Sequence, residues 1–172
     1  MLNKIMETFV KTILIGIGAT FTMDIWAFLL KIIFNIKSLN YQFVGRWIGH
    51  FPKGKFFHES IANAQPIANE LIIGWLAHYL IGITFAVLLV SIYGNTWLEN
   101  PTFFPALLIG IVTIVAPFFI MQPCLGIGIA ASNLPDPNMA RFKSLLTHSI
   151  YGIGLYLSAL FLNYILSVFR AV

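Results

Sequence analysis

Residues 12–34 read TILIGIGATFTMDIWAFLLKIIF, a stretch in which Asp24 is the only acidic side chain and Lys31 the only basic one. It is longer than the roughly 20 residues with which an α-helix crosses a bilayer. Lys31 lies near its end, where the ammonium group can reach the lipid head groups while the carbon chain stays in apolar surroundings. The stretch therefore predicts a membrane-spanning helix.

Three further stretches of this kind, near 71–93, 103–126 and 143–169, follow in the chain. The composition agrees, with 59% hydrophobic and 9% charged residues, against about 45–50% and about 25% in soluble domains. This excludes a soluble core. We expect an all-α membrane protein, in which residues 1–172 form a single four-transmembrane-helix bundle.

The positive charges predict the orientation of this bundle. The first loop (35–70) and the third loop (127–142) with the adjoining Lys143 carry six Lys and Arg residues, the short second loop (94–101) carries none, and the two ends carry three. Because cytoplasmic loops are enriched in Lys and Arg, we expect loops one and three in the cytoplasm. The net charge of +4 is thus a topology signal; it indicates the lipid bilayer as partner and no nucleic acid.

The first loop contains an apolar pattern of its own. Leu39, Phe43, Trp47 and Phe51 recur every four residues and share one helix face. Arg46 lies on another face. The pattern predicts an interfacial helix over 39–51, with the apolar face towards the bilayer or the bundle.

The third span is predicted to be broken. Pro117 and Pro123 each remove a backbone donor, and a glycine-rich segment, 126–133, follows. Irregular backbone at membrane depth is tolerated where it packs against protein or lines a cavity. We therefore expect a deviation from regular helix at Pro117 or Pro123, with 126–133 packed, and Asp136 or Asn138 capping the fourth span.

Three titratable side chains lie within the spans: Asp24, His78 and His148. A charged group in hydrocarbon costs about 2.5–3.5 kcal/mol on insertion scales. All three are expected in the half of the bundle nearest loops one and three. Further polar residues approach from the same side, namely Gln122, Arg46, His50, His58, Glu70, Asn138 and Arg141.

Three interpretations of Asp24, His78 and His148 remain open. The residues form interhelical hydrogen bonds that fix packing, or handle a proton or a ligand, or bind a metal ion, since two histidines and one carboxylate suit iron. No two of them share a helix at ligand spacing, so the metal signal is weak and no cofactor is implied. Arg46 or Arg141 is the expected counter-charge of Asp24. A single cysteine, Cys124, excludes an intramolecular disulfide.

Several motifs resemble one protein family: GATFTMD at 18–24, VGRWIGH at 44–50, GWLAHY at 74–79, QPCLGIGIAAS at 122–132 and PNMAR at 137–141. Together they resemble the bacterial membrane proteins grouped as domain of unknown function 2938. The resemblance covers about Ile15 to Leu160 and implies a bacterial inner-membrane protein. It implies no activity and no catalytic residues.

Three functions compete on this basis. We favour a small transporter-like or channel-like protein with a polar intramembrane site open to the cytoplasm; the convergence of polar groups, the broken span and a faint repeat around His78 and His148 support it. Four spans are few for a transport path, so a homodimer is expected. The alternatives are a non-catalytic accessory or assembly protein and a membrane-embedded enzyme acting on a lipid or quinone-like substrate.

Overall fold

A computed structural model of the protein describes residues 2–36 and 38–170, and all regular elements within these ranges are helical. Four stretches are long and apolar enough to cross a membrane: Lys4–Phe34, Glu70–Glu99, Phe103–Cys124 and Pro137–Phe169. The prediction of an all-α chain with four such helices is confirmed. The stretches begin or end several residues beyond the predicted limits near 12, 93 and 143.

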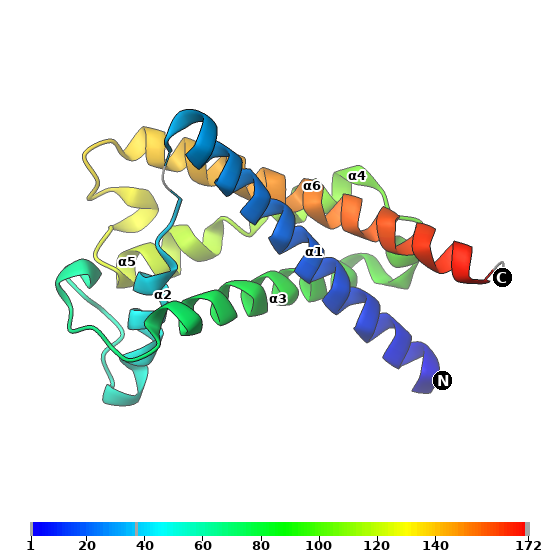
Figure 1. Cartoon of the computed structure of the whole chain (residues 1–172), viewed down its shortest axis with the longest axis horizontal. Coiled ribbons are helices and arrows are strands. Elements are labelled where there is room, and N and C mark those ends of the chain that lie inside the picture. The colour runs from blue at the N-terminus through cyan, green and yellow to red at the C-terminus, as the bar shows by residue number, and fades with distance from the viewer. Residues whose placement is uncertain (1, 37, 171–172) are drawn as a thin grey trace.

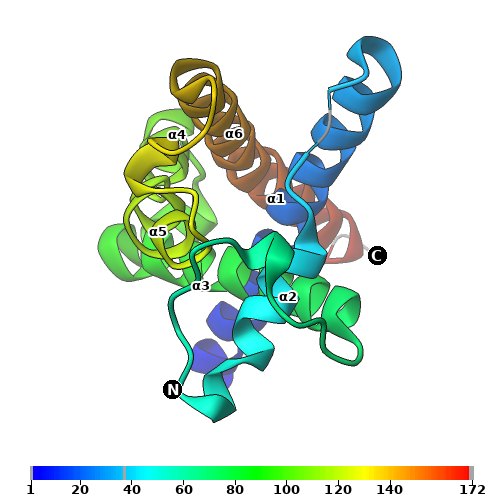
Figure 2. The ribbon, with the colours of Figure 1, turned by 90° about the vertical axis from the view of Figure 1, so that its left-hand side faces the viewer.

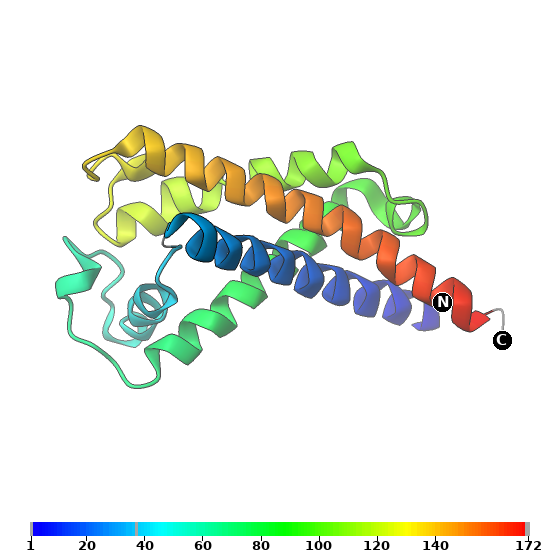
Figure 3. The ribbon, with the colours of Figure 1, turned by 45° about the horizontal axis from the view of Figure 1, so that its top comes forward.

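The long helices lie side by side in an order that differs from their order in the chain. Helix α1 (Leu2–Phe34) packs between α3 (Glu70–Glu99) and α6 (Pro137–Arg170), and α6 packs against α4 (Phe103–Val112). Loops one and three gather at one end of the bundle, and both termini lie towards the other (Figures 1 and 3). Loops one and three, which we predicted on the same side of the membrane, thus lie at the same end of the bundle.

Small residues bring these helices close together. A Cβ atom at Gly110 of α4 would lie 2.6 Å from the Cα of Gly152 in α6, and one at Gly16 of α1 would lie 2.7 Å from the Cα of Ile83 in α3. Such contacts are typical of helix packing in membranes. Between these crossings lies a core of small and medium side chains: Ile15, Ala19, Ala86, Leu89, Leu155 and Ala159.

Large apolar side chains lie exposed on the outside of the bundle. They include Phe28, Ile33, Leu80, Phe104 and Phe161. A monomeric soluble protein rarely exposes apolar patches of this extent. The outer surface is therefore compatible with a lipid environment.

The prediction of a loop over 94–101 is wrong for its first part. Helix α3 continues to Glu99 across a kink at Gly94, whose φ of 72° and ψ of −175° are not helical. Glycine adopts a positive φ without the steric cost of a side chain. The extra turn buries Trp97, whose indole Nε1–H donates to the carbonyl of Thr102 at 3.1 Å.

The predicted break in the third span is confirmed. Helix α4 ends at Val112, and a five-residue π-helical segment (η3, Pro117–Met121) and one turn of helix (α5, Gln122–Cys124) continue the span. A proline ring clashes with the carbonyl four residues earlier, here that of Thr113, where the regular helix stops. The following segment, 126–133, contains the short helix η4 (Ile129–Ala131) and is packed in part: Ala131 is buried, whereas Ile129 is exposed.

The first loop folds against this broken span. It contains α2 (Tyr41–Gly49) and two short helices, η1 (Phe51–Lys53) and η2 (Ile61–Asn63). The amide of His58 donates to the carbonyl of Cys124 at 2.9 Å, and that of Ile61 to the carbonyl of Leu125 at 3.1 Å. Loop one and the end of the third span therefore lie against each other at this end of the bundle (Figure 2).

The predicted helix over 39–51 is confirmed for its central part, Tyr41–Gly49, whose fully buried residues stand beside the predicted apolar face. Val44, Gly45 and Arg46 are buried, whereas Leu39 is exposed. The reason is the close contact between α2 and α3, where Gly45 faces the backbone of Glu70 and leaves no room for a side chain. The four-residue spacing of the apolar residues does not indicate the close approach of α2 and α3 at Gly45.

Candidate functional site

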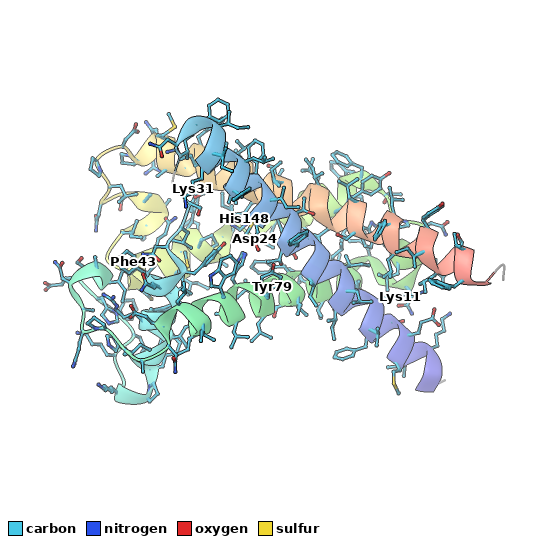
Figure 4. All side chains as sticks on the ribbon, in the orientation of Figure 1. Lys11, Asp24, Lys31, Phe43, Tyr79 and His148 are labelled. Carbon is cyan, nitrogen blue, oxygen red and sulfur yellow. The ribbon has the colours of Figure 1, made fainter. Side chains whose placement is uncertain are left out.

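Asp24 and His78 form a hydrogen-bonded pair between α1 and α3. The His78 Nε2 atom lies 2.9 Å from Oδ1 of Asp24, and the Tyr79 hydroxyl donates to Oδ2 of the same carboxylate at 2.9 Å. Both carboxylate oxygens thus have a hydrogen-bond partner on α3. Figure 4 places Asp24 and Tyr79 together in the space between the two helices.

Tyr41 of α2 completes this cluster. Its hydroxyl oxygen lies 3.1 Å from Nε2 of His78, and its ring lies 4.4 Å from the imidazole and 4.5 Å from the ring of Trp75, centroid to centroid. Burial raises the pKa of Tyr41 above its ordinary value, and the negative charge of Asp24 raises it further. The Tyr41 hydroxyl therefore keeps its hydrogen at neutral pH and is available as a donor.

A cavity of about 470 Å³ lies beside this cluster. Its walls come from α1, α2, α3, α6 and the broken third span, and most of them are apolar. The polar lining residues are Thr20, Ser38, Tyr41, His78, Thr84, Gln122, Lys143, Ser144, Thr147, His148 and Tyr151, together with the indole-bearing Trp47. His78 and His148 thus line one cavity, and Asp24 is joined to it through His78.

The hydrogen bonds of His148 fix its tautomer. The Thr113 hydroxyl donates to the carbonyl of Gly110 at 2.6 Å, so its oxygen is left as an acceptor for the Nδ1 of His148, 3.0 Å away. Nδ1 therefore carries the hydrogen. In the neutral ring Nε2 is then an acceptor, and the residue lines the cavity.

Gln122 is a buried side chain with unused hydrogen-bonding capacity. It is 8% exposed, it lines the cavity, and its Oε1 has no hydrogen-bond partner among the described residues. An unsatisfied buried acceptor costs about 1–3 kcal/mol. A ligand or water that donates to Oε1 would remove this cost, which makes Gln122 a candidate contact for a bound molecule.

The prediction of Arg46 as a counter-charge of Asp24 is wrong, because Arg46 binds Glu70. Its Nε and Nη2 donate to the two carboxylate oxygens of Glu70 at 2.9 and 3.0 Å, and Nη1 donates to the carbonyls of Ile61, Ala62 and Ala64. The hydrogen bonds to Glu70 raise the pKa of Arg46. Arg46 and Glu70 thus hold the first loop to the start of α3 and take no part in the cavity.

Arg141 is not the counter-charge either. Its Nε donates to the carbonyl of Ala130 at 2.8 Å, and its Nη1 donates to the Asn138 side chain at 3.1 Å, both at the exposed start of α6. Asp136 caps this helix, since its Oδ1 accepts from the amide of Met139 at 3.1 Å. The partner of Asp24 is therefore His78 and not an arginine.

His50 and His58 form a second buried pair within loop one. Nε2 of His50 lies 3.0 Å from the carbonyl of Gln65 and must carry the hydrogen, so Nδ1 accepts from Nε2 of His58 at 2.8 Å. The Nδ1 of His58 is buried and without a partner in the described structure. The pair is separate from Asp24 and His78 and stabilises the fold of the loop.

The structure does not assemble the metal-ligand set considered above. Within residues 2–36 and 38–170, no three His, Cys, Asp or Glu side chains lie close enough to hold a metal ion. Asp24 and His78 are joined, but His148 uses its Nδ1 for Thr113.

Comparison with known families assigns the chain. Residues 13–162 match the profile of the family described as "Protein of unknown function (DUF2938)". The chain is a member of the DUF2938 family. This confirms the resemblance seen in the sequence motifs. Comparison with curated proteins gives no match, and comparison with solved structures gives none.

Sequence reasoning missed several residues of the site in this DUF2938 protein. Tyr41, Tyr79, Thr113 and Lys143 contact the titratable residues or line the cavity. Tyr79 directly follows His78, and Thr113 stands one helical turn after Gly110, but neither position indicates which distant residue it meets. The packing of α1 and α2 against α3, and of α6 against the third span, provides these contacts.

Proposed function

We propose that this DUF2938 protein is a transporter-like membrane protein whose cavity holds a small amphiphile. The observation that carries the proposal is a cavity of about 470 Å³ lined by residues of all four membrane-length stretches. Sites for small molecules usually measure about 300–1,000 Å³ and combine apolar walls with a few polar groups. The apolar walls would hold the body of the ligand, and the polar groups its head.

The polar groups that support this proposal stand on different walls. His78 lies on α3, Gln122 on the third span and His148 on α6. Gln122 and His148 each offer an acceptor that no described side chain uses. A ligand that is apolar throughout would leave these groups unsatisfied, which favours a molecule with a polar head.

We further propose that the protein lies in the bacterial inner membrane as a homodimer, with loops one and three in the cytoplasm. The positive charges of these loops support the orientation. In a Cys124→Ala background, single cysteines at Lys53 and Asn95 should be labelled by a membrane-impermeant maleimide from opposite sides. Labelling of both from one side contradicts the orientation. A monomer in nanodiscs, measured by light scattering, contradicts the dimer.

The function is tested with two fluorescent probes that share one ring system. N-phenylnaphthylamine is neutral and reports on the cavity in nanodiscs; anilinonaphthalene sulfonate is permanently charged, crosses bare bilayers slowly, and reports on transport into liposomes that contain albumin. Ala116→Phe fills the cavity, because Ala116 lines it. Ala68→Phe is the matched control, because Ala68 is exposed in the first loop.

We expect saturable binding of the neutral probe and faster influx of the sulfonate with the unchanged protein and with Ala68→Phe. Ala116→Phe should lower both by about tenfold, which corresponds to an overpacking cost within the usual 1–3 kcal/mol. Binding that Ala116→Phe leaves unchanged would contradict the cavity as the site. Binding without faster influx would contradict transport.

A further inference from the structure

Two oxygen atoms compete for one nitrogen of His78. Its Nε2 lies 2.9 Å from Oδ1 of Asp24 and 3.1 Å from the hydroxyl oxygen of Tyr41. A ring nitrogen carries either one hydrogen or one free lone pair. When Nε2 carries the hydrogen and donates it to the Asp24 carboxylate, the hydrogen of the Tyr41 hydroxyl is free to point to a partner in the cavity, which Tyr41 lines.

The pair offers one site for a further proton, the second ring nitrogen of His78. Both hydrogen bonds of the His78 ring in the described structure involve Nε2, so the other ring nitrogen, Nδ1, is left to take up a proton. Protonation of Nδ1 turns the ring into an imidazolium beside a carboxylate, so the net charge of the pair changes from −1 to zero. Neutralising the pair removes a net charge from an apolar region.

The charges around the cavity indicate which ligand this change would serve. Lys143 lines the cavity together with the two histidines, and the lining contains no Asp or Glu side chain within the described residues. Asp24 does lie near by and is held on the far side of His78. An anionic head group is therefore attracted by Lys143 and repelled by Asp24, and the repulsion ends when the Asp24–His78 pair takes up a proton.

We propose that the Asp24–His78 pair is the proton-binding site of a cavity for anionic amphiphiles, and that one proton enters with each ligand. The inference rests on the proposed function, because it needs a ligand in the cavity. Binding of the two is reciprocal: the proton strengthens ligand binding by the same factor by which the ligand strengthens proton binding. No covalent step is involved, and the proton adds to Nδ1 of His78 while Asp24 remains a carboxylate.

Other titratable groups face the pair. They are Tyr79 on α3, Tyr41 on α2 and, across the cavity, His148 and Lys143 on α6. His148 has a hydroxyl and not a carboxylate as its partner, so a charge on its ring would be uncompensated and is disfavoured. The experiment separates His148 from the pair by changing Asp24 alone.

The test measures binding of anilinonaphthalene sulfonate and of neutral N-phenylnaphthylamine in nanodiscs from about pH 5 to pH 8, the range in which histidine titrates. Proton uptake on adding the sulfonate is followed with an indicator dye in weak buffer. Asp24→Asn removes the charge of the pair and keeps the shape of the side chain. Asp136→Asn, the same change at the exposed start of α6, is the control.

We expect uptake of one proton per sulfonate bound and, in the upper part of the range, about a tenfold loss of sulfonate affinity for each pH unit. The neutral probe should show neither effect. Asp24→Asn should bind the sulfonate without proton uptake and without pH dependence, and Asp136→Asn should behave like the unchanged protein.

Sulfonate binding without proton uptake by the unchanged protein overturns the inference, whatever the variants do. A pH dependence that persists in Asp24→Asn, or that is equal for both probes, also overturns it. If only the neutral probe binds, the inference of an anionic ligand is wrong, while the cavity remains the proposed binding site. If neither probe binds, the proposed function fails together with the inference.

Discussion

Replacing Arg46 by methionine should release the first loop from the bundle. Arg46 makes five hydrogen bonds, two to the Glu70 carboxylate and three to the carbonyls of Ile61, Ala62 and Ala64. Both side chains of the ion pair are about nine-tenths buried. After the substitution Glu70 keeps one hydrogen bond, from the amide of Ile67 at 3.3 Å, and its charge is no longer compensated.

The expected cost follows from this loss. Breaking a buried ion pair by removing one partner costs about 3–5 kcal/mol. Because the pair connects loop one to α3, the cost should appear as local opening of residues 55–69 rather than as loss of the whole fold. At about 1.4 kcal/mol for each factor of ten, amide exchange in this segment should become roughly two to four powers of ten faster.

Hydrogen exchange followed by mass spectrometry in nanodiscs measures this change. Arg46→Met/Glu70→Met removes both charges and should restore much of the protection. Arg141→Met is the control, since Arg141 is exposed and its hydrogen bonds lie at the start of α6. Exchange that rises less than about tenfold, or a double variant as unprotected as Arg46→Met alone, would refute the reasoning.

Three further predictions concern stability. Burial lowers the pKa of His58 below its ordinary value of 6.5, so the opened loop binds a proton that the folded loop excludes. Protection of residues 55–65 from hydrogen exchange should therefore decrease as the pH falls below that value. The variant His58→Gln should lack this pH dependence. Gly110→Ala places a methyl group 2.6 Å from the Cα of Gly152 and should lower the free energy of unfolding in a detergent titration by about 1–3 kcal/mol; an unchanged midpoint would show that the helices move apart freely. Tyr151→Phe removes the hydrogen bond to the carbonyl of Gly82 at 2.6 Å and should cost about 0.5–1.5 kcal/mol in the same titration, whereas Tyr164→Phe, at an exposed position, should cost nothing measurable.

The long helices and the broken span could be predicted from the sequence because their signals are local. A continuous apolar run defines each span, and Pro117 removes a backbone donor wherever it stands in a helix. The end of α3 was missed because Gly94 and Asn95 resemble a loop, while burial of Trp97 extends the helix. The C-terminal end of α3 therefore depends on tertiary packing, which the neighbouring residues in the sequence do not indicate.

The partners of charged residues could not be predicted for the same reason. The sequence placed Asp24 and His78 in the same half of two spans, and they do meet. It also placed Arg46 on the same side, but the short turn that returns loop one to α3 brings Glu70 to Arg46 first. Depth along a helix axis follows from residue counting; the direction of a side chain around the axis depends on which helices become neighbours.

The π-helical segment Pro117–Met121 determines where the third span can change its number of residues. The amide of Gln122 donates to the carbonyl of Pro117, five positions earlier, so this turn contains one residue more than an α-helical turn. Deleting one residue here would restore ordinary α-helical bonding and leave the following residues close to their present direction around the axis. The same deletion in the regular helix α4 would rotate everything that follows by about 100°, the angle of one residue in an α-helix, and would turn Gln122 away from the cavity. Over evolutionary time, a change of length in the third span should therefore be tolerated within 117–121 and not within α4.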